Sequence, residues 1–232
     1  MKKRYKINRR QFLTVASGFC AASILPYSIF NFFGHKVPIE YAPPIIKVVG
    51  VGSAGVFIIN HMIDSRLQGV KFIVADTDSQ FLDSSKAPVK LRLGKIVADT
   101  DTDPEIGRKA ALESAEAIRN TLKDSQIVFI LAGFGGGTGT GAAPVIADIC
   151  KEIGILTVAV VTKPFSFEGR KRVVRAIEGI SALEKAADTV IAIPADRIRS
   201  LIPKNAKMII FIKTLDEIIL KSVKHIYLGL LR

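Results

Sequence analysis

The chain has 232 residues, 49% of them apolar, which is enough for one well-packed domain with additions and too few for two generous domains. Its formal charge is +12, but seven cations and one carboxylate in residues 1–40 account for half of that charge. Only +6 is left for the rest of the chain, and this split argues against nucleic acid as a partner. Two cysteines occur, and they predict no disulfide framework.

Residues 1–35 join a basic stretch to an apolar run. The segment Asn8-Arg9-Arg10-Gln11-Phe12-Leu13 is similar to a twin-arginine export signal. Residues 11–34 contain no Asp, Glu, Lys, Arg or His, and as a helix they would span about 30 Å of hydrocarbon. No small-x-small cleavage site follows, which favours an uncleaved membrane anchor over a removed signal; a helix lying on the membrane is the alternative. The Pro-rich residues 36–44 predict a stiff linker.

From residue 45 onwards, short apolar runs alternate with longer helix-like segments. This alternation is typical of an α/β fold, a Rossmann-like doubly wound domain with a mostly parallel sheet. We expect the domain over residues 45–205 and its long C-terminal helix over 206–232. The expected strands are 45–49, 71–75, 89–93, 127–132, 156–162 and 189–193, and further helices are expected at 104–123 and 142–153.

Two glycine-rich loops follow predicted strands, where such sheets bind ligands. The first, Gly50–Gly55, is a complete GxGxxG motif, and Asp76 follows about twenty residues later. Alone it predicts either a dinucleotide site or a tight packing turn. The second, Gly133–Gly141, is richer in glycine than one turn requires, and its backbone N–H groups and threonine hydroxyls predict a site for several phosphates.

The stretch Gly135–Ala147 is similar to the signature of the FtsZ and tubulin superfamily, on its bacterial side. The segments 46–52, 76–80, 104–110 and 161–172 extend the resemblance over residues 45 to about 227. Membership would imply a protein that binds GTP or GDP, takes part in cell division and assembles with FtsZ-type filaments or with itself.

The resemblance also implies which residues contact the nucleotide. It places the phosphates on the second loop, backbone contacts on the first loop, and the ribose and base near the remaining three side chains. A carboxylate at the last of these suits guanine, which offers two adjacent N–H donors. The implied residues are Gly52, Ser53, Ala54, Gly55, Gly135, Gly136, Gly137, Thr138, Gly139, Thr140, Gly141, Glu168, Arg172 and Asp216.

The sequence departs from the family pattern at several places. The 232 residues end before the family's catalytic acidic loop and second domain, so we expect no catalytic residue here and weak or no self-activated GTP hydrolysis. Phe57 and Ala195 replace polar residues of the family's site. Three aspartates in residues 98–103 predict either a Mg²⁺ site or, as we favour, a lost γ-phosphate sensor.

The sequence therefore predicts a membrane-associated guanine-nucleotide-binding protein of cell division or membrane remodelling. Its alternatives are a GTPase completed in trans by a partner's acidic loop, an NAD-dependent oxidoreductase that uses Gly50–Gly55, and a truncated copy without activity. The cytoplasmic face of the membrane is favoured because GTP is found there, although six basic residues before the apolar run favour sending the domain across. The last helix should expose an apolar face containing Ile219, Val223, Ile226 and Leu230.

Overall fold

A computed structural model describes residues 44–95, 103–199, 201–203 and 205–230. The predicted signal or anchor in residues 1–35 lies outside this part of the chain, as do most of the 36–44 linker and residues 98–102 of the acidic loop. Within the described residues, no helix combines the length and the hydrophobicity needed to cross a membrane.

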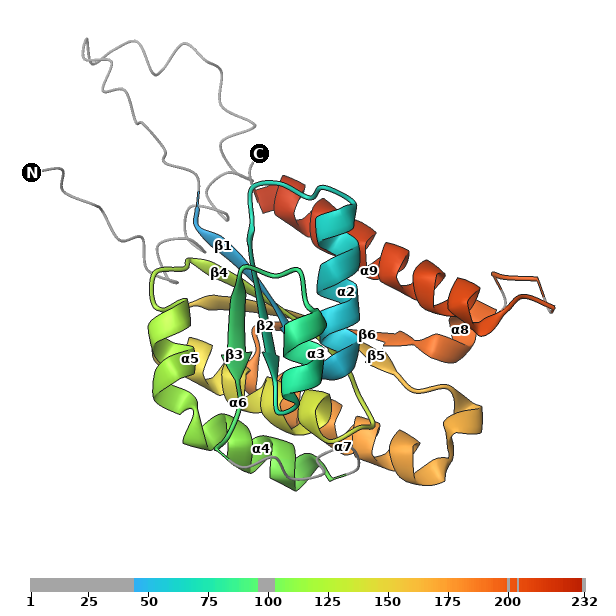
Figure 1. Ribbon diagram of the computed structural model, residues 1–232, viewed down its shortest axis with the longest axis horizontal. Helices are drawn as coiled ribbons and strands as arrows, with labels where there is room; N and C mark the ends of the chain where they lie inside the picture. The colour runs from blue at the N-terminus through green and yellow to red at the C-terminus, as the bar shows by residue number, and fades with distance from the viewer. Residues whose placement is uncertain (1–43, 96–102, 200, 204, 231–232) are drawn as a thin grey trace, which may run out of the picture.

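Six parallel strands form one sheet in the order β3-β2-β1-β4-β5-β6 (Figure 1). This is the order of a doubly wound Rossmann-type sheet, which confirms the predicted fold class. Each strand lies within two residues of its expected position, because most are predominantly apolar runs; the edge strand at residues 89–92 instead alternates apolar and charged residues. The strands are β1 (Ile46–Val51), β2 (Lys71–Asp76), β3 (Val89–Arg92), β4 (Ile127–Gly133), β5 (Leu156–Lys163) and β6 (Thr189–Pro194).

Helices cover both faces of the sheet (Figure 1). One face packs against α2 (Gly52–Asp64), α3 (Ser79–Ser84) and α9 (Met208–Leu230). The other packs against α4 (Pro104–Glu113), α5 (Ala115–Leu122), α6 (Thr138–Glu152) and α7 (Arg170–Ala186). Two short helices, η2 (Ser166–Glu168) and α8 (Ala195–Arg199), lie in the connections that follow β5 and β6.

The structure differs from the expected helices at three places. The segment predicted as one helix over 104–123 is broken at Ser114, whose Oγ accepts a hydrogen bond from the Gly94 N–H at 2.9 Å. Helix α6 begins four residues earlier than predicted, inside the second glycine loop. The predicted exposed face of α9 is wrong, because Ile219 and Val223 are fully buried against the sheet.

A buried lysine on β1 ties the sheet to the end of α5. Lys47 is 5% exposed, and its Nζ donates to the Thr121 carbonyl at 2.5 Å and to the Asp124 carboxylate. The ammonium lowers the pKa of Asp124, so this carboxylate binds its proton less readily in the folded chain than in the unfolded chain.

We expect Asp124→Asn to lower the free energy of unfolding by about 2 kcal/mol at neutral pH, because it removes a charged acceptor from a buried cation. The difference should shrink as the pH falls below about 4, where Asp124 of the unfolded parent chain takes up a proton, and vanish at the lower pH at which the folded chain is protonated too. Urea unfolding at several pH values measures it. Asp64→Asn is the matched control: it breaks the Lys86–Asp64 pair, both of whose side chains are more than half exposed, and should cost under about 0.5 kcal/mol. Equal losses in the two variants would contradict a special role for Lys47.

Candidate functional site

The carboxyl ends of the parallel strands share one edge of the sheet, and both glycine loops lie there. The first loop joins β1 to α2, with strand and helix adjacent in sequence at Val51 and Gly52. The second joins β4 to α6. This is the edge at which doubly wound sheets bind ligands.

The first loop is a tight turn whose glycines are required by packing. Gly52 has a φ of +73°, which disfavours any other residue. A Cβ at Gly50 would lie 2.4 Å from the carbonyl oxygen of Gly55, and one at Gly55 would lie 2.8 Å from that of Leu131. The GxGxxG spacing is therefore explained by the approach of α2 to the sheet, without reference to a ligand.

The two loops touch each other, which brings the first turns of α2 and α6 together. A Cβ at Gly52 would lie 2.9 Å from the backbone nitrogen of Gly139. A Cβ at Gly133 would lie 2.7 Å from the Cβ of Ala54. The hydroxyl oxygens of Thr77, after β2, and Thr138 are 2.8 Å apart. The sequence did not single out this threonine pair, because the two residues are 61 positions apart.

The N-termini of α2 and α6 differ from those of α3 and α4 in their capping. Helices α3 and α4 are capped by Asp78 and Asp103, whose carboxylates accept hydrogen bonds from Gln80 N–H and Glu105 N–H at 2.8 and 2.9 Å. Helices α2 and α6 have no side-chain cap and no acidic residue in their first turns. Their backbone N–H groups and helix dipoles are thus directed at one place without a carboxylate of their own, an arrangement suited to an anion.

Packing also accounts for several glycines of the second loop. A Cβ at Gly139 would lie 2.5 Å from the Gly133 carbonyl oxygen, and one at Gly141 would lie 1.8 Å from that of Pro104. Thr140, implied as a phosphate contact, is buried, and its Oγ1 accepts a hydrogen bond from the Gly135 N–H at 2.8 Å. Gly136, by contrast, is partly exposed. Part of the richness in glycine is therefore structural.

Glu168 and Arg172, implied at the ribose and base, lie next to the second loop. Glu168 accepts a hydrogen bond from the Phe165 N–H at 2.8 Å and forms an ion pair of 3.4 Å with Arg172. A Cβ at Gly135 would lie 2.9 Å from the carbonyl oxygen of Arg172, so the start of α7 packs against the loop. Arg172 is about half exposed and accessible to a ligand.

Asp216 lies on α9, on the side that faces α2. The residue is 8% exposed, and burial raises the pKa of its carboxyl to about 6, against an opposing effect of His61 on α2. Its neighbour Glu217 makes a contact of 3.3 Å with the His61 Nε2. Asp216 therefore lies near α2, through His61. The other implied residues form a separate set of contacts between the two glycine loops and the start of α7; they are Gly52, Gly135, Gly139, Glu168 and Arg172.

Asp76 is placed unfavourably for the ribose contact of a dinucleotide site. It is 2% exposed, and its Oδ1 accepts hydrogen bonds from the N–H groups of Thr77 and Asp78 at 2.7 and 3.2 Å. Burial raises the pKa of this carboxyl. The side chain shapes the turn after β2, and a ribose hydroxyl would have to displace that packing to reach it.

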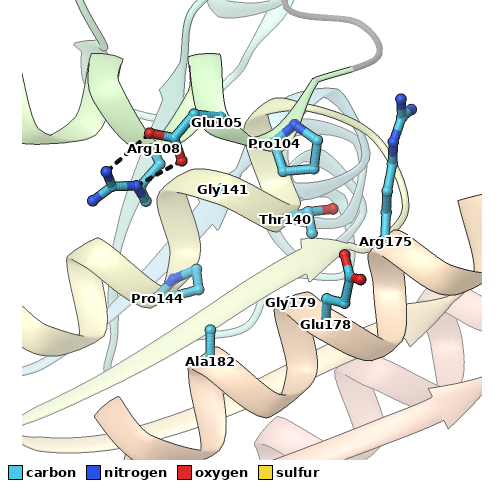
Figure 2. Close-up of a pocket in the computed structure, with 10 residues that line it drawn as sticks. All are labelled: Pro104, Glu105, Arg108, Thr140, Gly141, Pro144, Arg175, Glu178, Gly179 and Ala182. Carbon is cyan, nitrogen blue, oxygen red and sulfur yellow. Dashed lines mark hydrogen bonds and ion pairs between the residues drawn. The ribbon is translucent and has the colours of Figure 1, made fainter.

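A pocket of about 160 Å³ lies on the other side of the α6 N-terminus, between α6, α4 and α7 (Figure 2). It contains the paired Glu105 and Arg108, joined at 2.8 and 2.9 Å, with Glu178 and Arg175 from α7. Carboxylates on two of its walls make it a poor site for a polyphosphate. Among the described residues, no group of three His, Cys, Asp or Glu side chains is arranged to hold a metal ion.

The sequence and the fold of this chain are both similar to those of known proteins. The profile of the Tubulin/FtsZ family, GTPase domain, matches residues 45–203. The chain belongs to the tubulin/FtsZ family. It is 46% identical over 186 residues to the cell division protein FtsZ of Pseudomonas putida, an alignment that covers 79% of this chain and 47% of that protein. The chain thus spans about half the length of this curated relative.

Solved structures of the family share the fold. An empty FtsZ dimer of M. jannaschii superposes with a TM-score of 0.76 at 38% identity, covering 88% of this chain and 59% of the other. The CetZ2 protein of Haloferax volcanii, solved as a protofilament with GTPγS, gives a TM-score of 0.70 at 20% identity. That alignment covers 79% of this chain and 58% of the other, and it supports the fold alone.

Proposed function

We propose that this chain binds GTP and GDP at the edge formed by α2, α6 and the start of α7, and acts in cell division or membrane remodelling. The observation that carries the proposal is the convergence of two uncapped, acid-free helix N-termini, which matches the needs of a nucleotide's phosphates. Family membership selects guanine nucleotides among the phosphate ligands that such a site would accept.

Further parts of the proposal concern the chain's setting. Residues 11–34 would hold it at a membrane, with the cytoplasmic face favoured, and FtsZ-type filaments or other copies of the chain would be its partners. We expect weak or no hydrolysis of GTP by the chain alone, with Mg²⁺ accompanying the nucleotide if the aspartates of residues 98–103 bind it. Pelleting with a full-length FtsZ tests the partner: filaments that neither change in length nor carry the chain would contradict it.

Equilibrium binding of fluorescent GDP and GTP, with and without Mg²⁺, tests the site directly. We expect Ser53→Asp to weaken binding about tenfold, because it adds a negative charge to the first turn of α2 beside the phosphates. The melting temperature should stay unchanged or rise, since a carboxylate there suits the helix dipole. Ser181→Asp, on the exposed side of α7, is the matched control and should bind as the parent does. Absence of binding up to about 1 mM would show that the fold was kept without the site.

Two alternatives are separated by simple additions to this experiment. A GTPase completed in trans would release phosphate only when the chain is mixed with a full-length FtsZ, and not from this chain alone. A dinucleotide site at Gly50–Gly55 would give a rise in melting temperature with NAD and none with GDP. The burial of Asp76 favours the guanine nucleotide over NAD.

A further inference from the structure

The first turns of α9 carry large apolar side chains that are exposed. Leu201, before the helix, is 69% exposed, and Met208, Ile209, Ile210 and Ile212 are 42–52% exposed. Because these four residues span more than one helical turn, their side chains point around the axis instead of towards the sheet alone. In Figure 1 this end of α9 extends away from the sheet, next to α8.

An aromatic cluster continues this surface towards α7. Phe211 meets Phe165 edge to face at 6.2 Å, and Phe165 stacks on Phe167 at 5.0 Å. Phe167 is itself 59% exposed. We call these six exposed residues the apolar corner: Phe167, Leu201, Met208, Ile209, Ile210 and Ile212.

Positive charge predominates near the apolar corner. Arg197, Lys207 and Lys213 are exposed there, and Asp196, whose carboxylate accepts hydrogen bonds from the Ser166 N–H, is a neighbouring anion. Three further cations follow Phe167, at 170–172, of which Arg172 is paired with Glu168. The described domain elsewhere mixes both charges, as in the Lys86–Asp64 and Arg119–Glu152 pairs. The corner is therefore an apolar surface whose neighbouring charges are in excess positive.

We propose that the apolar corner docks onto an anionic lipid surface, with its aliphatic and aromatic side chains among the upper acyl chains and its cations among the headgroups. Exposed Ile, Met and Phe side chains at a protruding helix end bury the most apolar area in acyl chains, which can surround them on all sides. Long Lys and Arg side chains can reach back to the headgroup phosphates. An acidic protein surface would match the cations and leave these apolar side chains without partners. A second copy would place like charges opposite one another.

Only the start of α9 is free to meet a membrane surface. Of its 23 residues, Met208–Ile212 include the exposed apolar side chains of the corner, whereas Ile219 and Val223 are buried against the sheet. If residues 11–34 anchor the chain, the corner supplies a second contact that fixes the orientation of the domain at the bilayer. The inference does not depend on nucleotide binding, and it holds or fails separately from the proposed function.

A fluorophore at the corner tests the proposal in the full chain. Ile209→Cys, in a Cys20→Ser background, is labelled with an environment-sensitive dye; Cys150 is fully buried, and burial raises the pKa of its thiol to about 12, which protects it from labelling. We expect a blue shift on adding vesicles of phosphatidylcholine with phosphatidylserine, and little shift with phosphatidylcholine alone. Adding Lys207→Glu and Lys213→Glu should weaken the response at least tenfold in lipid concentration.

The matched control is the same dye at Leu112→Cys on α4, an exposed apolar position in the opposite helix layer, where no shift is expected. Two results would overturn the proposal. One is an unshifted dye at position 209 while the chain sediments with the vesicles, which would assign membrane binding to residues 11–34 alone. The other is a blue shift without vesicles that grows with protein concentration, which would show that a second copy covers the corner.

Discussion

Replacing Gly141 by alanine is expected to lower the free energy of unfolding by about 3 kcal/mol or more. The new Cβ would lie 1.8 Å from the carbonyl oxygen of Pro104 and 2.7 Å from the backbone nitrogen of Arg108. Both are backbone atoms of α4, so no rotation of a side chain relieves the overlap. Helices α4 and α6 must separate, and the apolar contacts between them are lost.

Urea unfolding followed by circular dichroism measures this loss. Gly229→Ala on α9 is the matched control, because a Cβ there meets no atom within 4 Å and alanine is the better helix former. It should leave the stability unchanged or raise it by up to about 1 kcal/mol. A Gly141→Ala variant within 1 kcal/mol of the parent would mean that α4 and α6 do not approach as closely as described.

The packing of Gly139 and Gly141 also changes how the site can be tested. A bulky residue at either position would abolish nucleotide binding by disturbing α6, whether or not the glycine touches phosphate. Loss of binding would then report on folding. Ser53 and Asp216 are better probes, because a change of charge at these side chains leaves the approach of α2, α4 and α6 intact.

Most of the strands were predictable because parallel strands covered on both faces are predominantly apolar. The run Ile127–Ala132, for example, is buried at every position, and no other local structure explains it as well. The break at Ser114 was not predictable, because it depends on a hydrogen bond from Gly94, twenty residues away. The helix propensities of the residues around Ser114 predict one uninterrupted helix.

The face of α9 was mispredicted for a related reason. Ile219 and Val223 are spaced as on any amphipathic helix, and the sequence does not state which layer will cover them. In the structure they pack with α2, and the exposed large apolar residues of α9 are Leu228 and four in the first turns, Met208, Ile209, Ile210 and Ile212. Hydrophobic periodicity identifies a face, but only the tertiary arrangement decides what covers it.

The site was located in sequence by its glycines, yet its chemistry depends on features that glycine does not reveal. The capping aspartates Asp78 and Asp103 occupy the N-termini of α3 and α4, whereas α2, α6 and α7 have neither a side-chain cap nor an acidic residue in the first turn and can receive an anion. The sequence predicts this difference in capping only when the first residue of each helix is known exactly. For α6 it was not, because the helix begins at Thr138 and had been predicted to begin at residue 142.

Asp216 offers the sharpest test of base recognition. Guanine presents two adjacent N–H donors, which an ionised carboxylate accepts with both oxygens. Burial raises the pKa of Asp216 to about 6, so the free protein carries the ionised form above that pH and the neutral acid below it. The neutral acid has a donor where an acceptor is needed. Affinity for GDP should therefore fall about tenfold between pH 7 and pH 5.

Asp216→Asn should weaken GDP binding about a hundredfold at pH 7 and should remove this pH dependence. The amide keeps one acceptor but turns its NH₂ towards the second guanine donor, which costs a charged hydrogen bond and leaves two donors opposed. Xanthine carries a carbonyl in place of that donor, so the same amide fits it, and the variant should prefer XDP to GDP. Titration of the parent and the variant with both nucleotides at pH 5 and pH 7 measures all four affinities. If the variant bound GDP as tightly as the parent at both pH values, the base would be read elsewhere and α9 would serve the fold alone.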